Sequence, residues 1–205
     1  MKTQPSNYVP TAPDDFIGGA KQIAAVLAKK AKALNKEGGT AKLLLYGPPG
    51  CGKTRLAEMF ANQLAGHSTM VESVNGRNVD IHLVRKWQES CRYANLFGGW
   101  SVKIINELDT CPPASQDLLL TYLDEMPSQT AFIGTSNLDL RQLVERFQTR
   151  MQQFRVKAPE HSEIEKLLQL WKIPKARISE IVVGCGGNVR AALLDAQSIV
   201  DVQSV

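Results

Sequence analysis

The sequence predicts an α/β fold, with a parallel sheet flanked by helices on both faces and a small all-helical lid at the C-terminal end. Strand-like apolar runs alternate with helical patterns through residue 157, which is typical of a parallel sheet. The run at residues 41–46 ends in a glycine-rich turn that leads into a helix. After "KAPEH" at residues 157–161, short helical segments follow. We therefore expect an α/β core at residues 1–157 and a helical lid at residues 158–205.

Hydrophobic periodicity and turn residues predict the elements of this fold in order. Residues 1–15 hold three prolines and no periodicity, so we expect an extended arm there. The helix at 115–126 follows two prolines, which makes Ser115 a candidate N-cap. The expected strands are 41–46, 68–75, 100–106, 130–137 and 152–156. The expected helices are 19–36, 52–66, 79–97, 115–126, 140–151, 161–171, 174–183 and 187–201.

The composition fits a soluble globular protein. The 205 residues are 43% hydrophobic and 21% charged. No apolar run approaches the roughly 18–20 residues that span a bilayer, and the N-terminal residues lack the apolar core of a secretory signal. Four cysteines without a CxxC pair and three scattered histidines argue against a zinc site or a disulfide framework. We expect a cytoplasmic protein with no membrane contact.

The stretch "GPPGCGKT" at residues 47–54 matches the phosphate-binding pattern G-x-x-x-x-G-K-[ST] between a strand and a helix. Its glycines let the backbone curl so that N–H groups point inward, and the helix dipole adds positive charge at the same place. Lys53 supplies a charge for the β- and γ-phosphates, and Thr54 offers a hydroxyl to Mg²⁺. The pattern predicts ATP and Mg²⁺ as ligands. The candidate phosphate-binding residues are Gly47, Pro48, Pro49, Gly50, Cys51, Gly52, Lys53 and Thr54.

One position in this turn has two readings. Cys51 fills a variable slot of the pattern. It can be a plain spacer, or it can be a reactive thiol, because a helix N-terminus can lower the pKa of a cysteine.

The stretch "VKIINELDT" at residues 102–110 is a buried strand that ends in polar residues. Glu107 lies where a carboxylate can orient and deprotonate the water that attacks the γ-phosphate. Asn106 lies where the Mg²⁺-associated carboxylate usually stands, and it offers one neutral oxygen and an NH₂ donor. Because Mg²⁺ takes most of its ligands from water and phosphate, we expect Asn106 to weaken the metal site without removing it.

With both motifs in place, the chain resembles AAA+ ATPases, and among them clamp-loader ATPase subunits, from residue 9 to about residue 200. "VPTAPDDFIGGAKQIAAVL" is similar to the family's N-terminal segment, which implies that Ile17 and Gly18 border the adenine. "FIGTSN" resembles the sensor-one strand, which implies that Asn137 senses the γ-phosphate and the water. "GGNVRAAL" resembles the sensor-two helix, which implies that Arg190 touches the nucleotide.

The segment "LVERFQTRMQQFRV" resembles the family's Ser-Arg-Cys segment. The resemblance implies that Arg150 enters the neighbouring subunit's site as an arginine finger. Its neighbours here are Thr149 and Met151, so the match is to the pattern, and Arg146, one helical turn earlier, is a rival.

The resemblance implies an ATPase that works as an oligomer on DNA in replication or repair. Partners would be further copies in a ring or spiral, related AAA+ subunits, DNA, and a sliding clamp or another replication protein. The sequence ends where clamp-loader subunits continue into a helical collar, so a ring would depend on other contacts. The net charge of +4 permits DNA binding without establishing it. The candidate DNA contacts, which can equally be a solvated face, are Arg77, Arg85, Lys86 and Arg92.

Two other functions fit the sequence. An AAA+ remodeller or helicase-loader-like ATPase would act on a protein, although the weak "LFGGW" at 96–100 is the only pore-loop candidate. A non-hydrolysing ATP-dependent scaffold is suggested by Asn106. The four retained hydrolysis candidates argue against the scaffold; they are Glu107, Asn137, Arg150 and Arg190.

Overall fold

The chain folds around a five-stranded sheet, described here by a computed structural model for residues 4–65, 71–94, 99–138, 145–171 and 173–203, without the side chains of 65 and 91–94. The sheet has the order β2-β3-β4-β1-β5, and every neighbouring pair is parallel. This confirms the predicted parallel sheet. The strands are β1 (Thr40–Tyr46), β2 (Val71–Asn75), β3 (Ser101–Asn106), β4 (Thr130–Ser136) and β5 (Gln152–Arg155).

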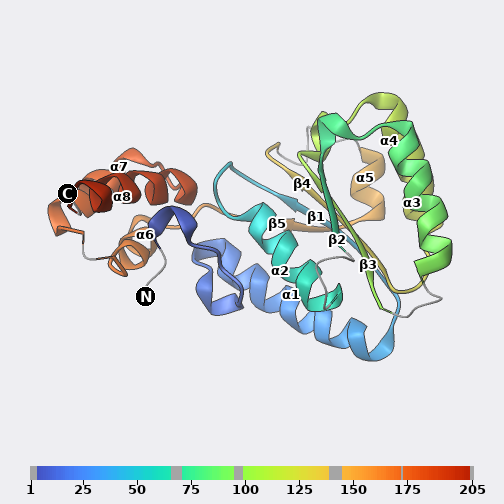
Figure 1. Cartoon of the computed structure of the whole chain (residues 1–205), viewed down its shortest axis with the longest axis horizontal. Coiled ribbons are helices and arrows are strands. Elements are labelled where there is room, and N and C mark those ends of the chain that lie inside the picture. The colour runs from blue at the N-terminus through green and yellow to red at the C-terminus, as the bar shows by residue number, and fades with distance from the viewer. Residues whose placement is uncertain (1–3, 66–70, 95–98, 139–144, 172, 204–205) are drawn as a thin grey trace.

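Helices cover both faces of the sheet (Figure 1). Neighbouring residues of β4 show why the strand is apolar throughout: Ile133 packs into one buried cluster, and Phe132 packs into the other. Successive side chains of a strand point to opposite faces, so a strand buried on both faces needs a continuous apolar run. One face carries α1 (Gly18–Glu37) and α2 (Lys53–Ala65), and the other carries α3 (Ile81–Ala94), α4 (Pro113–Asp124) and α5 (Glu145–Arg150).

The strand register brings polar residues together at the carboxyl edge of the sheet. Tyr46 of β1 lies opposite Ser136 of β4, and Asn75 of β2 lies opposite Asn106 of β3. The chain leaves β1 through Gly47 with φ of 146°, where an added Cβ would lie 2.2 Å from the carbonyl oxygen of Val156. Ligands of open α/β sheets bind beyond this edge, so the fold positions the glycine-rich turn for that purpose.

Three C-terminal helices form a group beyond the sheet (Figure 1). They are α6 (His161–Leu168), α7 (Lys175–Gly184) and α8 (Val189–Gln203). They share a buried cluster of their own that includes Ile164 and Ala192. The predicted helices are therefore present, while the division of the chain at residue 157 stays a prediction. None of the helices in the described segments is long and apolar enough to cross a membrane.

The N-terminal arm differs from its prediction. It was expected to be extended, but it holds two short 3₁₀ helices, Pro5–Asn7 and Pro13–Asp15. The Asp15 carboxylate accepts hydrogen bonds from the backbone N–H groups of Ala12 and Thr11 at 2.8 and 2.9 Å, and these bonds lower its pKa. Such side-chain bonds to nearby backbone stabilise turns, which hydrophobic periodicity does not reveal.

The start of α4 also differs from its prediction. The helix begins at Pro113, so Ser115 lies inside its first turn and is not the N-cap. A proline is favoured at the first helical position because its fixed φ suits the helix. The Ser115 hydroxyl instead donates to the backbone oxygen of Val79 at 2.8 Å and ties α4 to the segment before α3. Most other boundaries agree within a few residues. Parts of four predicted elements lie outside the described residues, namely 66, 68–70, 95–97 and 140–144.

Glu163 links the C-terminal helices to the core. Its carboxylate accepts from the N–H of Gly18 at 3.1 Å and from the N–H of Glu160, which precedes α6, at 2.9 Å. We expect Glu163→Ala to lower the free energy of unfolding by about 1–2 kcal/mol, the usual cost of a lost helix cap or of an unpaired backbone group. Urea unfolding measures this loss. Glu163→Gln keeps an acceptor and should lose less, and an unchanged midpoint for Glu163→Ala would contradict the link.

Candidate functional site

The glycine-rich turn forms a tight loop at the start of α2. Gly50 and Gly52 adopt φ of 74° and 94°, which favour glycine. Lys53 is the first residue of α2 and is 7% exposed. Its ammonium donates to the backbone oxygens of Gly47 and Pro48 at 2.8 and 2.6 Å. Burial lowers the pKa of Lys53, with a smaller contribution from nearby Arg190. The loop therefore holds a largely buried cation that donates to two backbone oxygens.

Cys51 is a packed spacer in this loop. Its side chain is 3% exposed and belongs to the core cluster beneath α1 and α2. The thiol donates to the backbone oxygen of Pro48 at 2.9 Å. Burial raises the pKa of Cys51 and outweighs the opposing effect of Lys53. The reactive-thiol alternative is therefore wrong, because a reactive cysteine needs a lowered pKa and solvent access.

The oxygen atoms that could serve Mg²⁺ lie beside the loop. The Thr54 hydroxyl donates to Asn106 Oδ1 at 3.0 Å, and the Thr135 hydroxyl donates to the same oxygen at 3.4 Å. The NH₂ end of Asn106 donates to the hydroxyl of Ser73 at 3.1 Å. The amide oxygen thus faces Thr54. A hydroxyl and an amide oxygen are hard donors of the kind Mg²⁺ prefers, so these residues fit a magnesium site that lacks a carboxylate.

Glu107 follows β3 in a left-handed conformation, with φ of 56° and ψ of 53°. A non-glycine residue held in this region costs energy and is often found at functional sites. Its carboxylate accepts from Asn75 Nδ2 at 3.1 Å, and its N–H donates to the Thr135 hydroxyl at 3.2 Å. Gly76 makes this possible, since a Cβ there would lie 2.2 Å from the carbonyl oxygen of Glu107.

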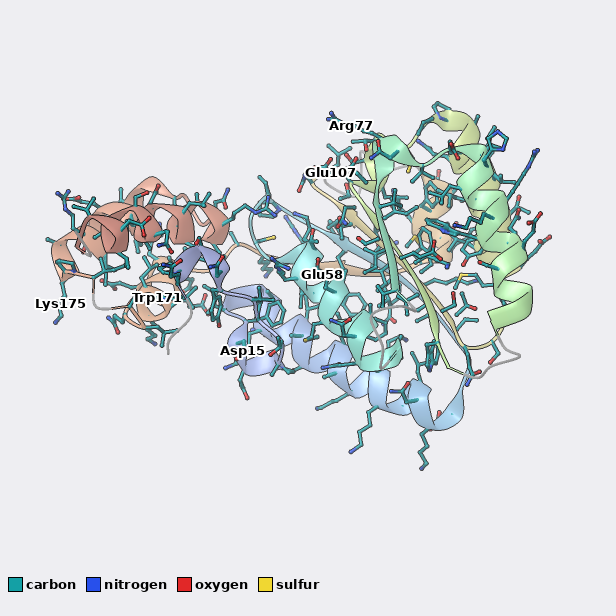
Figure 2. All side chains as sticks on the ribbon, in the orientation of Figure 1. Asp15, Glu58, Arg77, Glu107, Trp171 and Lys175 are labelled. Atoms are coloured by element: carbon teal, nitrogen blue, oxygen red, sulfur yellow. The ribbon has the colours of Figure 1, made fainter. Side chains whose placement is uncertain are left out.

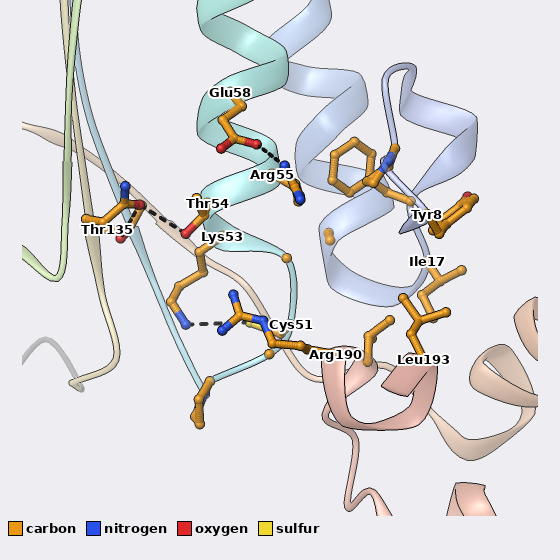
Figure 3. A pocket seen from close by; sticks show the side chains of 18 of the residues that line it. Tyr8, Ile17, Cys51, Lys53, Thr54, Arg55, Glu58, Thr135, Arg190 and Leu193 are labelled. Atoms are coloured by element: carbon orange, nitrogen blue, oxygen red, sulfur yellow. Dashed lines mark hydrogen bonds and ion pairs between the residues drawn. The ribbon is translucent and has the colours of Figure 1, made fainter. Parts of the chain in front are cut away.

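These residues face a cavity of about 720 Å³, within the usual range for small-molecule sites (Figure 3). Figure 3 shows Lys53 and Thr54 at one end, with Tyr8, Ile17 and Leu193 at the other. The cavity therefore has a cationic end and a largely apolar end. The predicted residues that line it are Ile17, Pro49, Gly50, Cys51, Gly52, Lys53, Thr54, Asn106, Glu107, Asn137 and Arg190.

Some lining residues were missed in the sequence. Asn75 was missed although it is the last residue of its strand, and the rule that singled out Asn106 would have found it. Thr135 precedes the end of β4 by one residue and carried no comparable signal. Tyr8 lies in the arm that was expected to be extended, and its ring meets Trp171 edge-on with centroids 5.7 Å apart. The contact of Tyr8 with the C-terminal helices depends on distant parts of the chain.

The C-terminal helices rest directly on the glycine-rich loop. The N–H of Val189 donates to the backbone oxygen of Gly50 at 3.1 Å, and a Cβ on Gly50 would lie 1.7 Å from Asn188 Oδ1. Asn188 also accepts from the N–H of Ala191 at 3.1 Å in the first turn of α8. This places Arg190 over the loop near Lys53 (Figure 3). The glycine-rich loop and the start of α8 are therefore in direct contact.

Other predicted residues lie outside the cavity lining. The backbone oxygens of Gly47 and Pro48 accept hydrogen bonds from the Lys53 ammonium, and the N–H of Gly18 donates to the Glu163 carboxylate. Arg150 at the end of α5 donates from Nε to both oxygens of Asp124 on α4, at 2.9 and 3.0 Å. The structure thus places Arg150 away from the chain's own site, and its role as a finger stays a prediction.

The candidate DNA contacts are exposed where they are described. Arg77 lies in a short 3₁₀ helix, Gly76–Asn78, and Figure 2 shows it at the same end of the molecule as Glu107. Arg85 and Lys86 are exposed on α3. The side chain of Arg92 and most of the 96–100 stretch lie outside the described residues. DNA contact and a solvated face both stay open for these residues.

Comparison with known proteins finds relatives that match part or most of this chain. RuvB of Mycoplasma genitalium, a Holliday junction branch migration complex subunit, is 31% identical over 116 residues, which cover 56% of this chain and 35% of that protein. Replication factor C subunit 4 of Saccharomyces cerevisiae is 23% identical over 94% of this chain and 62% of that protein. The chain thus spans about a third to two thirds of these relatives.

The solved structures show the same fold. The RuvB Holliday junction branch migration motor of Thermotoga maritima superposes with a TM-score of 0.74 at 18% identity, over 98% of this chain and 67% of that one. The family described as "ATPase family associated with various cellular activities (AAA)" matches residues 43–158, the stretch from β1 to the start of the C-terminal helices. The chain also has the parallel strand order, the glycine-rich loop after β1 and a carboxylate directly after β3. This chain therefore belongs to the AAA family of ATPases.

Proposed function

We propose that this chain binds ATP with Mg²⁺ and hydrolyses it slowly, as a subunit of an oligomer that acts on DNA. One observation carries the proposal: Lys53, Thr54, Asn106 and Glu107 converge on the cationic end of one nucleotide-sized cavity. A buried lysine on a glycine-rich loop serves an anion, and the oxygens beside it serve a metal.

Phosphate binding would use the loop as it stands. Lys53 would exchange the backbone oxygens of Gly47 and Pro48 for phosphate oxygens. Backbone N–H groups and the N-terminus of α2 would add their partial charges. Phosphate anions would also offset the burial that lowers the pKa of Lys53, since an opposite charge favours the charged form.

The metal site would rest on Thr54 and Asn106. Because the Thr54 hydroxyl gives its hydrogen to Asn106, the lone pairs of its oxygen are free to face a cation. When bound, Mg²⁺ would neutralise charge on the phosphates. Glu107 would accept a proton from the attacking water and hold that water in line, and Asn137 lies close enough to line the same cavity.

The oligomeric and DNA-directed parts of the proposal rest on similarity. The relatives named above include a branch migration complex subunit and a replication factor C subunit. We propose DNA, further copies of this chain or related AAA+ subunits as partners, with a sliding clamp or another replication protein as a further partner. The exposed cations Arg77, Arg85 and Lys86 would contact the DNA backbone. A cytoplasmic location stays a prediction.

Two alternatives have specific support. A protein-directed remodeller fits the same family, and a non-hydrolysing scaffold fits the neutral Asn106 beside Thr54. An ATPase assay with and without primed DNA, run beside a mass measurement with a non-hydrolysable ATP analogue, separates them. Stimulation by DNA supports the proposal, turnover that only proteins stimulate supports the remodeller, and assembly without turnover supports the scaffold.

Lys53→Ala tests the nucleotide site itself. We expect ATP binding and ATP-dependent assembly to be lost, because the buried ammonium of the glycine-rich loop would be the charge that binds the phosphates. Calorimetry of ATP binding measures the effect. Lys42→Ala, on β1 outside the cavity lining, is the control and should bind ATP normally. Unchanged affinity in Lys53→Ala would remove the phosphate-binding reading of the loop.

A further inference from the structure

We propose that a hydrogen-bond relay through Thr135 fixes the orientation of the Asn106 amide, with its oxygen toward Thr54, and that Ser73 completes this arrangement by receiving the NH₂ end. Thr135 and Ser73 would then be the positioning residues that let an asparagine serve where a carboxylate usually stands. The inference rests on the proposed function of the site.

The direction of the relay begins at the backbone. The N–H of Glu107 can only donate, and it donates to the Thr135 hydroxyl at 3.2 Å. Because Thr135 accepts on that side, its own hydrogen is available for Asn106 Oδ1 at 3.4 Å. Thr135 is 3% exposed, so water cannot easily replace either bond. A Thr135 hydroxyl that donates toward Asn106 favours the oxygen as the end of the amide that faces it.

The strand register supplies the other partner. Asn106 lies opposite Asn75 in the parallel pair of β2 and β3, so Ser73, two residues earlier on β2, lies on the same face. Its hydroxyl takes the hydrogen bond from Asn106 Nδ2 at 3.1 Å. The two hydroxyls hold opposite ends of one amide.

A reversed Asn106 amide would weaken Mg²⁺ binding at this site. Its NH₂ group would donate to the Thr54 oxygen, occupy a lone pair there and turn hydrogens toward the place of the cation. An aspartate has two equivalent oxygens, so it has no wrong orientation. The dependence on Thr135 and Ser73 is thus a consequence of the asparagine at position 106.

The first test needs no nucleotide. In a ¹⁵N-labelled protein, the side-chain NH₂ signals of Asn106 are identified as those missing from Asn106→Asp. We expect one sharp pair in the wild type, and a second pair or exchange broadening in Thr135→Val, which keeps the side-chain shape but lacks the hydroxyl. Thr135→Ser keeps the hydroxyl and should restore the single pair. An unchanged Asn106 signal in Thr135→Val overturns the relay.

The second test is a double-mutant cycle. The measured quantity is the Mg²⁺ concentration that gives half-maximal binding of an ATP analogue and, separately, a half-maximal ATPase rate. In the Asn106 background, we expect Thr135→Val and Ser73→Ala each to raise this concentration by about tenfold. This is the lower end of the loss in metal affinity that usually follows when a residue that supports a metal ligand is removed. In the Asn106→Asp background, we expect a change of less than about twofold, because the orientation no longer matters. Thr121→Val, on the exposed face of α4, is the matched control.

The cycle separates the relay from a general effect on the site. Thr135→Val also removes the partner of the Glu107 N–H in both backgrounds, so the quantity compared between them is the Mg²⁺ requirement and not the rate at saturating Mg²⁺. Equal increases in the Mg²⁺ requirement in both backgrounds overturn the inference. If Lys53→Ala leaves nucleotide affinity unchanged, the proposed function fails instead, and the NMR result still decides the amide orientation.

Discussion

Arg150→Ala is expected to lower the ATPase rate of the assembled protein by about 10³–10⁵, the range for an arginine finger supplied in trans, while nucleotide affinity stays unchanged. Arg150 is absent from the lining of the chain's own cavity. The Arg150 Nε donates to the Asp124 carboxylate, and its Nη1 donates to the backbone oxygen of Arg146 at 3.2 Å. A guanidinium has five N–H groups, so donors remain for a neighbouring γ-phosphate. Asp124 would then orient the finger at the protein surface.

Mixing two defective chains measures this role. A Lys53→Ala chain has a dead site but an intact Arg150, and an Arg150→Ala chain has the reverse. We expect mixed oligomers to regain activity at interfaces that pair a good site with a good finger. Arg146→Ala, which removes the surface pair with Asp117, is the matched control and should keep most activity. If mixed oligomers form and stay inactive, the finger is another residue, and Arg146 is the next candidate.

Glu107→Gln is expected to lower turnover by about 10²–10⁴, the usual contribution of a general base, with ATP still bound. The amide keeps the size of the side chain but cannot take a proton from water. Asn75 Nδ2 donates to the Glu107 carboxylate at 3.1 Å. The backbone of Glu107, directly after β3, is in the left-handed region, which sets the direction in which this side chain leaves the strand. The structure thus places in the cavity a carboxylate that accepts a hydrogen bond from Asn75.

Single-turnover hydrolysis beside ATP binding measures the effect of Glu107→Gln. Glu58→Gln is the control, because Glu58 lines the same cavity while its carboxylate pairs with Arg55 at 2.7 Å. Wild-type turnover in Glu107→Gln would move the role of base to another acid. Asp109 is the candidate, since its Oδ1 is buried and lacks a hydrogen-bond partner among the described residues.

The local signals in the sequence were sufficient for the sheet and for the phosphate loop. Strands buried on both faces must be continuously apolar, and the loop needs its glycines and lysine at fixed spacing within eight residues. Asn106 and Glu107 were found for the same reason, because they directly follow an apolar strand. These features depend on residues that are neighbours in the chain.

Tertiary structure decided the environment of these residues. Burial under α1 and α2 raises the pKa of Cys51, although its place at a helix N-terminus suggested the opposite. The parallel register of β2 and β3 brings Ser73 to the amide of Asn106, and the docking of α8 brings Arg190 to the loop. Hydrogen-bond partners and desolvation arise between segments that lie far apart in the chain. The sequence by itself therefore determined which chemical groups this protein carries, and the packing of those segments decided which groups face one another and in which orientation.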